Sequence, residues 1–161
     1  MRVIAVLLCL AAGSFAEDPV FLRVNSHGAV EWYRVKDGAT VIRVARGEYA
    51  RRPYEGKIAT RKPQPFFVES FLIDRTEVTN AQYARFLSAE PEAARFVRPA
   101  VPGLERTEKG WRASPGLEAH PVTACTGEGA VAFAKWVGGR IPTTPEWEKA
   151  AGGVEGRLWP W

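Results

Sequence analysis

The hydrophobic pattern of the sequence changes its period over residues 66–89, and this change restricts the chain to folds that combine strands with helices. Residues 66–73 form an apolar run that is interrupted only by Glu69 and Ser70. A short continuous apolar run predicts a strand that is buried on both faces. Within the next dozen positions the pattern becomes helical, so a pure sheet or a pure bundle is excluded.

A capping box begins the helix that follows this run. The Thr79 hydroxyl can accept a hydrogen bond from the amide of Gln82, while the Gln82 side chain reaches back to the main chain of Thr79. The apolar residues that come next share one helix face at positions i, i+3 and i+4: Tyr83, Phe86 and Leu87. We expect this helix to end near Ser88 or Ala89, ahead of a Glu-Pro pair.

Two runs rich in β-branched and aromatic residues precede the helix, at residues 30–35 and 40–44. Asp37 and Gly38 lie between the runs, and an Asp-Gly pair tolerates the positive φ angles of a tight turn. The sequence therefore predicts a β-hairpin here. Residues 17–24 precede it as an apolar-rich lead without a motif.

Two further helices are expected after a long connection. Residues 91–119 are rich in proline, glycine and charge, which predicts a surface loop with room for one short strand around Trp111. Thr126 can cap the first of these helices, whose apolar stripe is Ala130, Phe133, Ala134 and Val137. Thr143 and Glu146 have the spacing of a second capping box. We expect that last helix to bury Trp147, Ala150 and Ala151. The fold class is α+β.

The N-terminus has the pattern of a secretory signal peptide over residues 1–16. Arg2 precedes a short apolar stretch, and the small residues Ser14 and Ala16 occupy the positions expected before a cleavage site. The stretch is shorter than the roughly 20 residues that a membrane span needs. Cys9 follows a leucine, which argues against a lipoprotein signal. We expect export, with residues 17–37 forming the lead and first hairpin strand and residues 38–161 forming the N-terminal part of a domain that is truncated here.

Charge and cysteine content exclude several classes of function. The 161 residues carry a formal charge of +4, and the basic residues are scattered rather than gathered in one stripe with aromatic residues, so nucleic-acid binding is not expected. Removal of the signal peptide leaves Cys125 as the only cysteine. A single cysteine can form neither an internal disulfide nor a cysteine-based metal site.

Four segments, in order, resemble the formylglycine-generating enzyme (sulfatase-modifying factor) family. They are residues 41–49 (VIRVARGEY), 67–83 (FVESFLIDRTEVTNAQY), 120–122 (HPV) and 139–151 (GRIPTTPEWEKAA). The final residues 159–161 (WPW) resemble an aromatic-Pro-Trp motif of the same family. The sequence departs from the family pattern at residues 125–127, where a tryptophan is usual, and at Lys149, where an aromatic residue is common.

The resemblance implies an irregular α+β fold related to the C-type-lectin topology, of which this sequence matches the N-terminal half. Catalytic members of the family use a pair of cysteines near the C-terminal end to bind copper and to oxidise a sulfatase cysteine to formylglycine. Calcium sites in the family also lie mainly in the later half. On this resemblance the partner is a sulfatase polypeptide, and the copper and calcium sites are expected outside residues 1–161.

Individual residues were weighed as candidates, and none is assigned to a catalytic, cofactor or metal site. Cys125 has the chemistry of a nucleophile, but its position before a capped helix favours a small buried hydrophobe. His120 lacks a second histidine at ligand spacing, so we expect its ring to bond a backbone group. Glu77 and Asn80 could line a pocket, although Asn80 could equally satisfy amides at the helix start. The tryptophans could stack a ligand, with core packing as the default.

Glu146 and Glu148 are first-turn acids that the helix dipole favours, and Arg140 could pair with one of them. Three functions remain open on these observations. The first is an exported formylglycine-generating oxidase, and the second is a non-catalytic exported binding or accessory module on the same scaffold. An iron-dependent member of the superfamily that forms sulfur–carbon bonds is disfavoured, because such members normally need an additional His-rich domain, which residues 1–161 do not contain.

Overall fold

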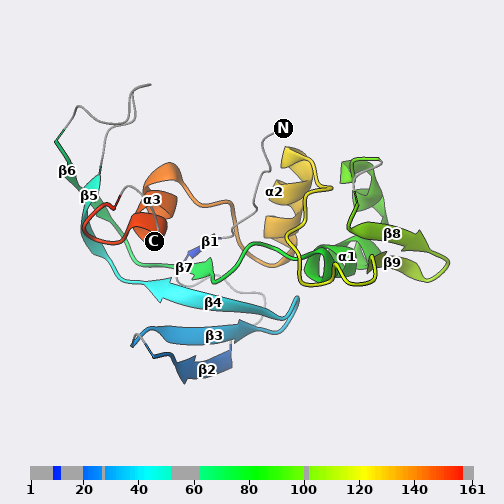
Figure 1. The fold of residues 1–161 in the computed structure, drawn as a ribbon, viewed down its shortest axis with the longest axis horizontal. Helices are drawn as coiled ribbons and strands as arrows, with labels where there is room; N and C mark the ends of the chain where they lie inside the picture. The colour runs from blue at the N-terminus through cyan, green and yellow to red at the C-terminus, as the bar shows by residue number, and fades with distance from the viewer. Residues whose placement is uncertain (1–8, 12–19, 27, 52–61, 100–101, 158–161) are drawn as a thin grey trace.

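The computed structural model describes residues 9–11, 20–26, 28–51, 62–99 and 102–157. These residues form short antiparallel sheets and helices, arranged as shown in Figure 1. The strands are β1 (Cys9–Ala11), β2 (Val20–Val24), β3 (Val30–Arg34), β4 (Ala39–Val44), β5 (Gly47–Arg51), β6 (Gln64–Val68), β7 (Phe71–Asp74), β8 (Leu104–Thr107) and β9 (Gly110–Ala113). The helices are α1 (Asn80–Ala89), the 3-10 helix η1 (Pro91–Phe96), α2 (Gly127–Trp136) and α3 (Thr144–Gly152). The α+β class is confirmed.

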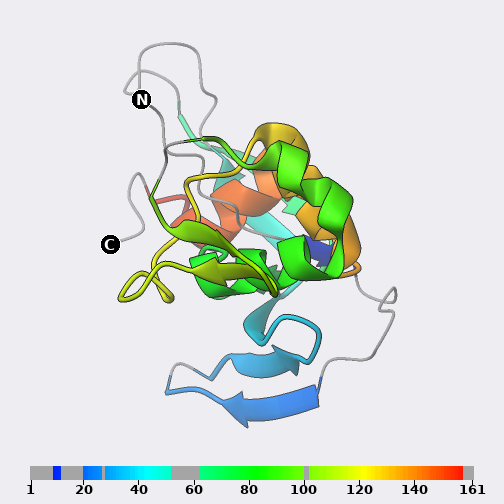
Figure 2. The same ribbon diagram turned by 90° about the vertical axis from the view of Figure 1, so that its right-hand side faces the viewer.

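The largest sheet has the strand order β1-β7-β4-β3-β2, with antiparallel neighbours throughout. The predicted hairpin is confirmed as β3 and β4, which pair from Glu31 opposite Ile42 to Arg34 opposite Ala39. Gly38 in its turn has a φ of 80°, which glycine adopts without a steric penalty. The lead predicted to have no motif supplies β2, the outer edge strand. Figure 2 shows β2 and β3 extending away from the helices.

The prediction of one buried strand over residues 66–73 is wrong, because the segment is divided between two sheets. β7 pairs with β4 and is buried, whereas β6 pairs with β5 and exposes Phe66 and Phe67. The two ladders share one register across the break, since Val44 lies opposite Phe71 and Gly47 lies opposite Val68. The segments therefore form one bent ribbon whose pairing is interrupted at residues 45–46 and 69–70.

The helical layer contains the main apolar core. The predicted capping box of α1 is confirmed, since Gln82 N donates to Thr79 Oγ1 (3.3 Å) and Thr79 N donates to Gln82 Oε1 (2.8 Å). Thr126 caps α2 as expected by accepting from Gly129 N at 3.1 Å. Apolar residues of α1, η1 and α2 and of the flanking loops pack together: Val78, Tyr83, Phe86, Leu87, Ala93, Val122, Cys125, Ala130, Phe133, Ala134 and Val137.

Residues 91–119 contain more regular structure than the predicted loop. The short strand expected around Trp111 is confirmed as β9, and it pairs with β8 in a hairpin that lies against α1. η1 fills part of the remainder and contributes Ala93 to the core. The many prolines and charges of this segment mask these elements in the sequence.

The predicted buried face of the last helix is also wrong. α3 begins with the expected capping box, in which Thr143 N donates to Glu146 Oε2 at 2.7 Å. However, Trp147 is 47% exposed, and the helix buries Glu146, Lys149 and Gly152 instead. The physical reason is that α3 packs on the polar bend of the ribbon, where Lys149 Nζ donates to Ala45 O (2.7 Å) and Gly47 O (2.8 Å).

The predicted signal peptide lies mostly outside the described residues and remains a prediction. Within it, residues 9–11 are described as β1, which pairs with β7. The described part of the chain contains no helix that is long and apolar enough to cross a membrane.

Candidate functional site

A buried ionic cluster connects the tip of the β3–β4 hairpin to the end of β7. Arg34 Nε and Nη2 donate to the two carboxylate oxygens of Asp37 at 2.7 and 2.6 Å, and Nη1 and Nη2 donate to those of Asp74 at 2.8 and 3.1 Å. The three residues are 2%, 1% and 4% exposed. One guanidinium therefore neutralises two carboxylates away from water. No motif in the sequence predicted this cluster; Arg34 within a β-branched run indicates at most a buried charge and not its partners.

Burial determines the protonation of this cluster. It raises the pKa of Asp74 to about 6 despite the opposing charge and hydrogen bonds of Arg34, and the neighbouring Asp37 carboxylate raises it further. For Arg34, burial acts to lower the pKa, but the hydrogen bonds and charges of both carboxylates hold it above its usual value. The cluster is thus a fixed cation between two carboxyl groups, one of which binds a proton unusually tightly.

The raised pKa of Asp74 predicts how stability depends on pH. Between the ordinary pKa of 3.8 and about 6 the folded state binds a proton that the unfolded state releases, so the free energy of unfolding should fall as pH rises through this interval. Across this interval the free energy of unfolding should fall by on the order of 3 kcal/mol in total. Urea unfolding of the wild type and of Asp74→Asn at a series of pH values measures it. The variant should lose this slope, and an unchanged slope would contradict the assignment.

Cys125 lies in the apolar core beside α2, as the hydrophobe interpretation predicted. The residue is 4% exposed, belongs to the same cluster as Tyr83 and Phe133, and forms an isolated β-bridge with Val97. Burial raises the pKa of its thiol. Because the thiolate is the reactive form, this cysteine is neither accessible nor activated.

We therefore expect Cys125 to resist alkylation until the protein opens. In native protein its reaction with iodoacetamide should be at least roughly a hundredfold slower than in guanidinium chloride, given core opening that costs about 3 kcal/mol or more. Mass spectrometry of the peptide that contains Cys125 measures the two rates separately from any reaction at Cys9. Comparable rates in the two conditions would show that the thiol is exposed.

The expectation that the His120 ring bonds a backbone group is wrong within the described residues. Its N–H donates to Leu117 O at 3.2 Å and its carbonyl accepts from Asn80 N at 2.9 Å, while the exposed imidazole has no hydrogen bond to any described residue. Asn80 is buried, and its Nδ2 donates to Leu117 O at 2.9 Å. Asn80 thus holds a loop on the start of α1 and does not satisfy an amide of the helix. Glu77 is half-buried.

The acidic residues at the start of α3 are structural partners. Arg140 donates to both carboxylate oxygens of Glu146 at 2.7 and 2.6 Å, which confirms the predicted pair. These bonds are the main reason that the pKa of Glu146 is lowered to about 2. Glu148 instead faces the ribbon, where its Oε2 accepts from Tyr49 Oη at 2.6 Å and from Arg51 Nε at 3.0 Å.

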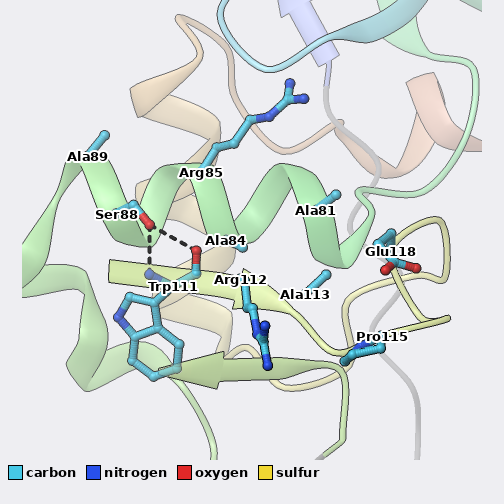
Figure 3. Close-up of a pocket in the computed structure, with 10 residues that line it drawn as sticks. All are labelled: Ala81, Ala84, Arg85, Ser88, Ala89, Trp111, Arg112, Ala113, Pro115 and Glu118. Carbon is cyan, nitrogen blue, oxygen red and sulfur yellow. Dashed lines mark hydrogen bonds between the residues drawn. The ribbon is translucent and has the colours of Figure 1, made fainter. Parts of the chain in front are cut away.

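Two shallow pockets adjoin each other along the exposed side of α1. The first, of about 700 Å³, lies between α1 and β9 (Figure 3), and the second, of about 510 Å³, lies between α1 and the β3–β4 turn. Both are lined by Ala81, Arg85 and Glu118, so we call them together the α1 groove. Trp111 lines this groove and also packs against the helical core, as does Trp136, whose ring centroid lies 5.6 Å from that of Phe86.

The described residues do not offer a donor set for copper. No group of three or more His, Cys, Asp and Glu side chains in the described ranges could hold a metal ion. Copper in proteins takes thiolate and imidazole ligands, and here Cys125 is buried among apolar side chains. No step of a metal-dependent reaction can be assigned to these residues.

Comparison with known proteins decides the family. A model of the sulfatase-modifying factor enzyme 1-like domain matches residues 26–161. The chain belongs to the sulfatase-modifying factor family. The matched range includes the buried ionic cluster, the bent ribbon, the helical core and the α1 groove. All of these features therefore lie within the family domain of this chain.

The proteins similar to this chain include enzymes named for formylglycine generation and proteins named as kinases. The chain is 31% identical over 159 residues to the formylglycine-generating enzyme of Streptomyces coelicolor, covering 80% of this chain and 49% of that protein. It is 29% identical over 187 residues to that of Bos taurus, covering 94% and 50%. It is also 31% identical over 126 residues to the serine/threonine-protein kinase pkn1 of Chlamydia pneumoniae, covering 74% and 20%. The chain thus spans half or less of the length of these curated relatives.

Proposed function

We propose that this chain forms the scaffold part of an exported formylglycine-generating oxidase that acts on a cysteine of a sulfatase polypeptide. The observation that supports this proposal is the similarity to formylglycine-generating enzymes over 80% and 94% of the chain. The described residues fit a scaffold role, because Arg34, Glu146 and Glu148 are engaged in structural pairs and Cys125 is buried. Export rests on the signal-peptide pattern of residues 1–16, and the proposal also gives the whole domain a C-type-lectin-related topology.

A direct assay tests the oxidase proposal. The complete protein that contains this chain is incubated with copper, oxygen, a thiol and a peptide containing the Cys-x-Pro-x-Arg motif. Mass spectrometry of the peptide should then show conversion of its cysteine to formylglycine. No conversion would exclude the oxidase, and N-terminal sequencing of the secreted protein tests cleavage after Ala16 independently.

The second candidate is a non-catalytic exported binding or accessory module. One observation favours it: a protein named as a kinase contains a segment similar to most of this chain within a fifth of its own length. The scaffold thus occurs in proteins with different names, and a fold alone does not fix a function. Absence of formylglycine in the assay above, with the protein folded, would favour this module.

A further inference from the structure

Along the edge of β9 that faces the α1 groove, the main-chain groups of one residue, Trp111, are hydrogen-bonded to a described residue, whereas those of Ala113 are not. In an antiparallel hairpin, alternate residues direct their main-chain groups to the partner strand and away from it. Ser114 N donates to Gly103 O at 3.0 Å, and Thr107 pairs with Gly110, so Trp111 and Ala113 direct their main-chain groups away from β8. They face α1, where β9 lies beside the helix (Figure 3).

Ser88 of α1 satisfies only the first of these two positions. Its hydroxyl accepts from Trp111 N at 2.8 Å and donates to Trp111 O at 3.1 Å. Ala113 lines the groove one step further along the same edge, and its outward N–H and C=O have no partner among the described residues. The neighbouring floor of the groove consists of the small side chains of Ala81 and Ala84, which leave room for an extended chain.

The groove also carries a cation that lacks a carboxylate partner. Arg85 lines both pockets, and in the described part of the chain its guanidinium contacts only a carbonyl, Asp37 O, at 2.7 Å. Arg112 lies at the opposite border of the pocket, but Glu105 already pairs with it at 2.8 and 2.9 Å. Arg85 is therefore the arginine of the groove with which a ligand carboxylate could form an ion pair.

We propose that the α1 groove binds an extended acidic segment of a partner protein, which hydrogen-bonds to the main chain of Ala113 and places a carboxylate against Arg85. Strand addition supplies affinity through main-chain bonds, and a side-chain ion pair supplies selectivity. A single-stranded nucleic acid fits less well, because it favours stacking aromatics along a basic track. Among the described lining residues, the aromatic ones are Trp111 in the first pocket and Tyr33 in the second, too few for a stacking track. This binding is independent of any oxidase activity.

Fluorescence anisotropy with defined peptides tests the proposal on the full chain. The probe is a short fluorescein-labelled peptide of alternating alanine and glutamate, which should bind saturably below about 1 mM. Arg85→Gln removes the charge and keeps a donor for Asp37 O, and it should weaken binding about tenfold. Ala113→Pro removes the outward N–H without breaking a ladder bond, and it should weaken binding at least severalfold. Circular dichroism confirms that each variant is folded.

Matched controls separate a specific groove from general attraction. Arg95→Gln removes an exposed arginine of η1 outside the groove and should leave the affinity unchanged within about twofold. A peptide in which lysine replaces glutamate should not bind, and a peptide with N-methylated alanines should bind more weakly. The proposal is overturned if the peptide shows no saturable binding or if Arg95→Gln weakens the peptide affinity as much as Arg85→Gln does. It is also overturned if the protein prefers an oligothymidine of equal charge, or if sedimentation shows a dimer and the dimer does not bind the peptide.

Discussion

Replacement of Arg34 by methionine should lower the free energy of unfolding by about 3–5 kcal/mol, the range measured when one partner of a buried ion pair is removed. Methionine fills much of the same space but leaves Asp37 and Asp74 as two buried carboxylates without a counter-charge. The four carboxylate oxygens that accept from Arg34 would lose these donors in a region that water does not reach, and in the described part of the chain only Asp37 Oδ1 would keep a partner, Ala39 N. Urea denaturation followed by circular dichroism measures the loss, and a variant that is unfolded without urea would be the extreme case.

Two comparisons make the Arg34 experiment specific. Arg95→Met removes an arginine of η1 that is 68% exposed and pairs with Glu92 at 4.0 Å, so it should change stability by less than about 0.5 kcal/mol. The combined variant Arg34→Met, Asp37→Asn, Asp74→Asn removes the uncompensated charges and should recover part of the loss. If Arg34→Met were as stable as Arg95→Met, the cluster would not be buried as described.

Replacement of Phe133 by alanine should lower the free energy of unfolding by a similar amount, about 3–5 kcal/mol. Phe133 is fully buried in α2, and its ring centroid lies 5.6 Å from those of Tyr83 and Phe86 and 5.8 Å from that of Trp136. Its removal leaves a cavity between α1 and α2 and breaks three aromatic contacts. Thermal and urea unfolding both report the change.

Val131→Ala is the matched control for Phe133→Ala. Val131 lies on the same helix but is 44% exposed, so its truncation should change the free energy of unfolding by less than about 0.5 kcal/mol. A similar loss in both variants would contradict the difference in burial between Phe133 and Val131. A small loss in Phe133→Ala would instead show that the helical layer is not closely packed.

The parts of the fold that follow from local chemistry were predictable from the sequence. The capping boxes at Thr79 and Thr143 depend on residues three positions apart, and the hairpin turn depends on Asp37 and Gly38. The apolar stripe of α2 is equally local. The burial of Cys125 followed from its place just before this stripe. Each of these features is determined within a few residues, so the sequence pattern was sufficient.

The features that were predicted wrongly or not at all depend on segments distant in the sequence that pack against an element. The apolar period of α3 indicated Trp147 as a buried residue, but the surface that α3 covers is a bend of carbonyls, which selects Lys149. The ionic cluster joins Arg34 to Asp74 across 40 positions, and no local pattern shows such a contact. The groove likewise exists only because β9 folds back on α1.

The bent ribbon has a consequence for how the chain can vary in length. Two unpaired residues on one strand, 45–46, lie opposite two on the other, 69–70, and the register continues unchanged beyond them. Because side chains alternate between the faces of a strand, one extra residue on a single side would turn every side chain of β5 or β6 to the opposite face. Tyr49 would then leave both the core and Glu148. An insertion at this bend therefore keeps the β5–β6 pairing in register with β4–β7 only if both strands gain the same number of residues, and it keeps the faces only if that number is even.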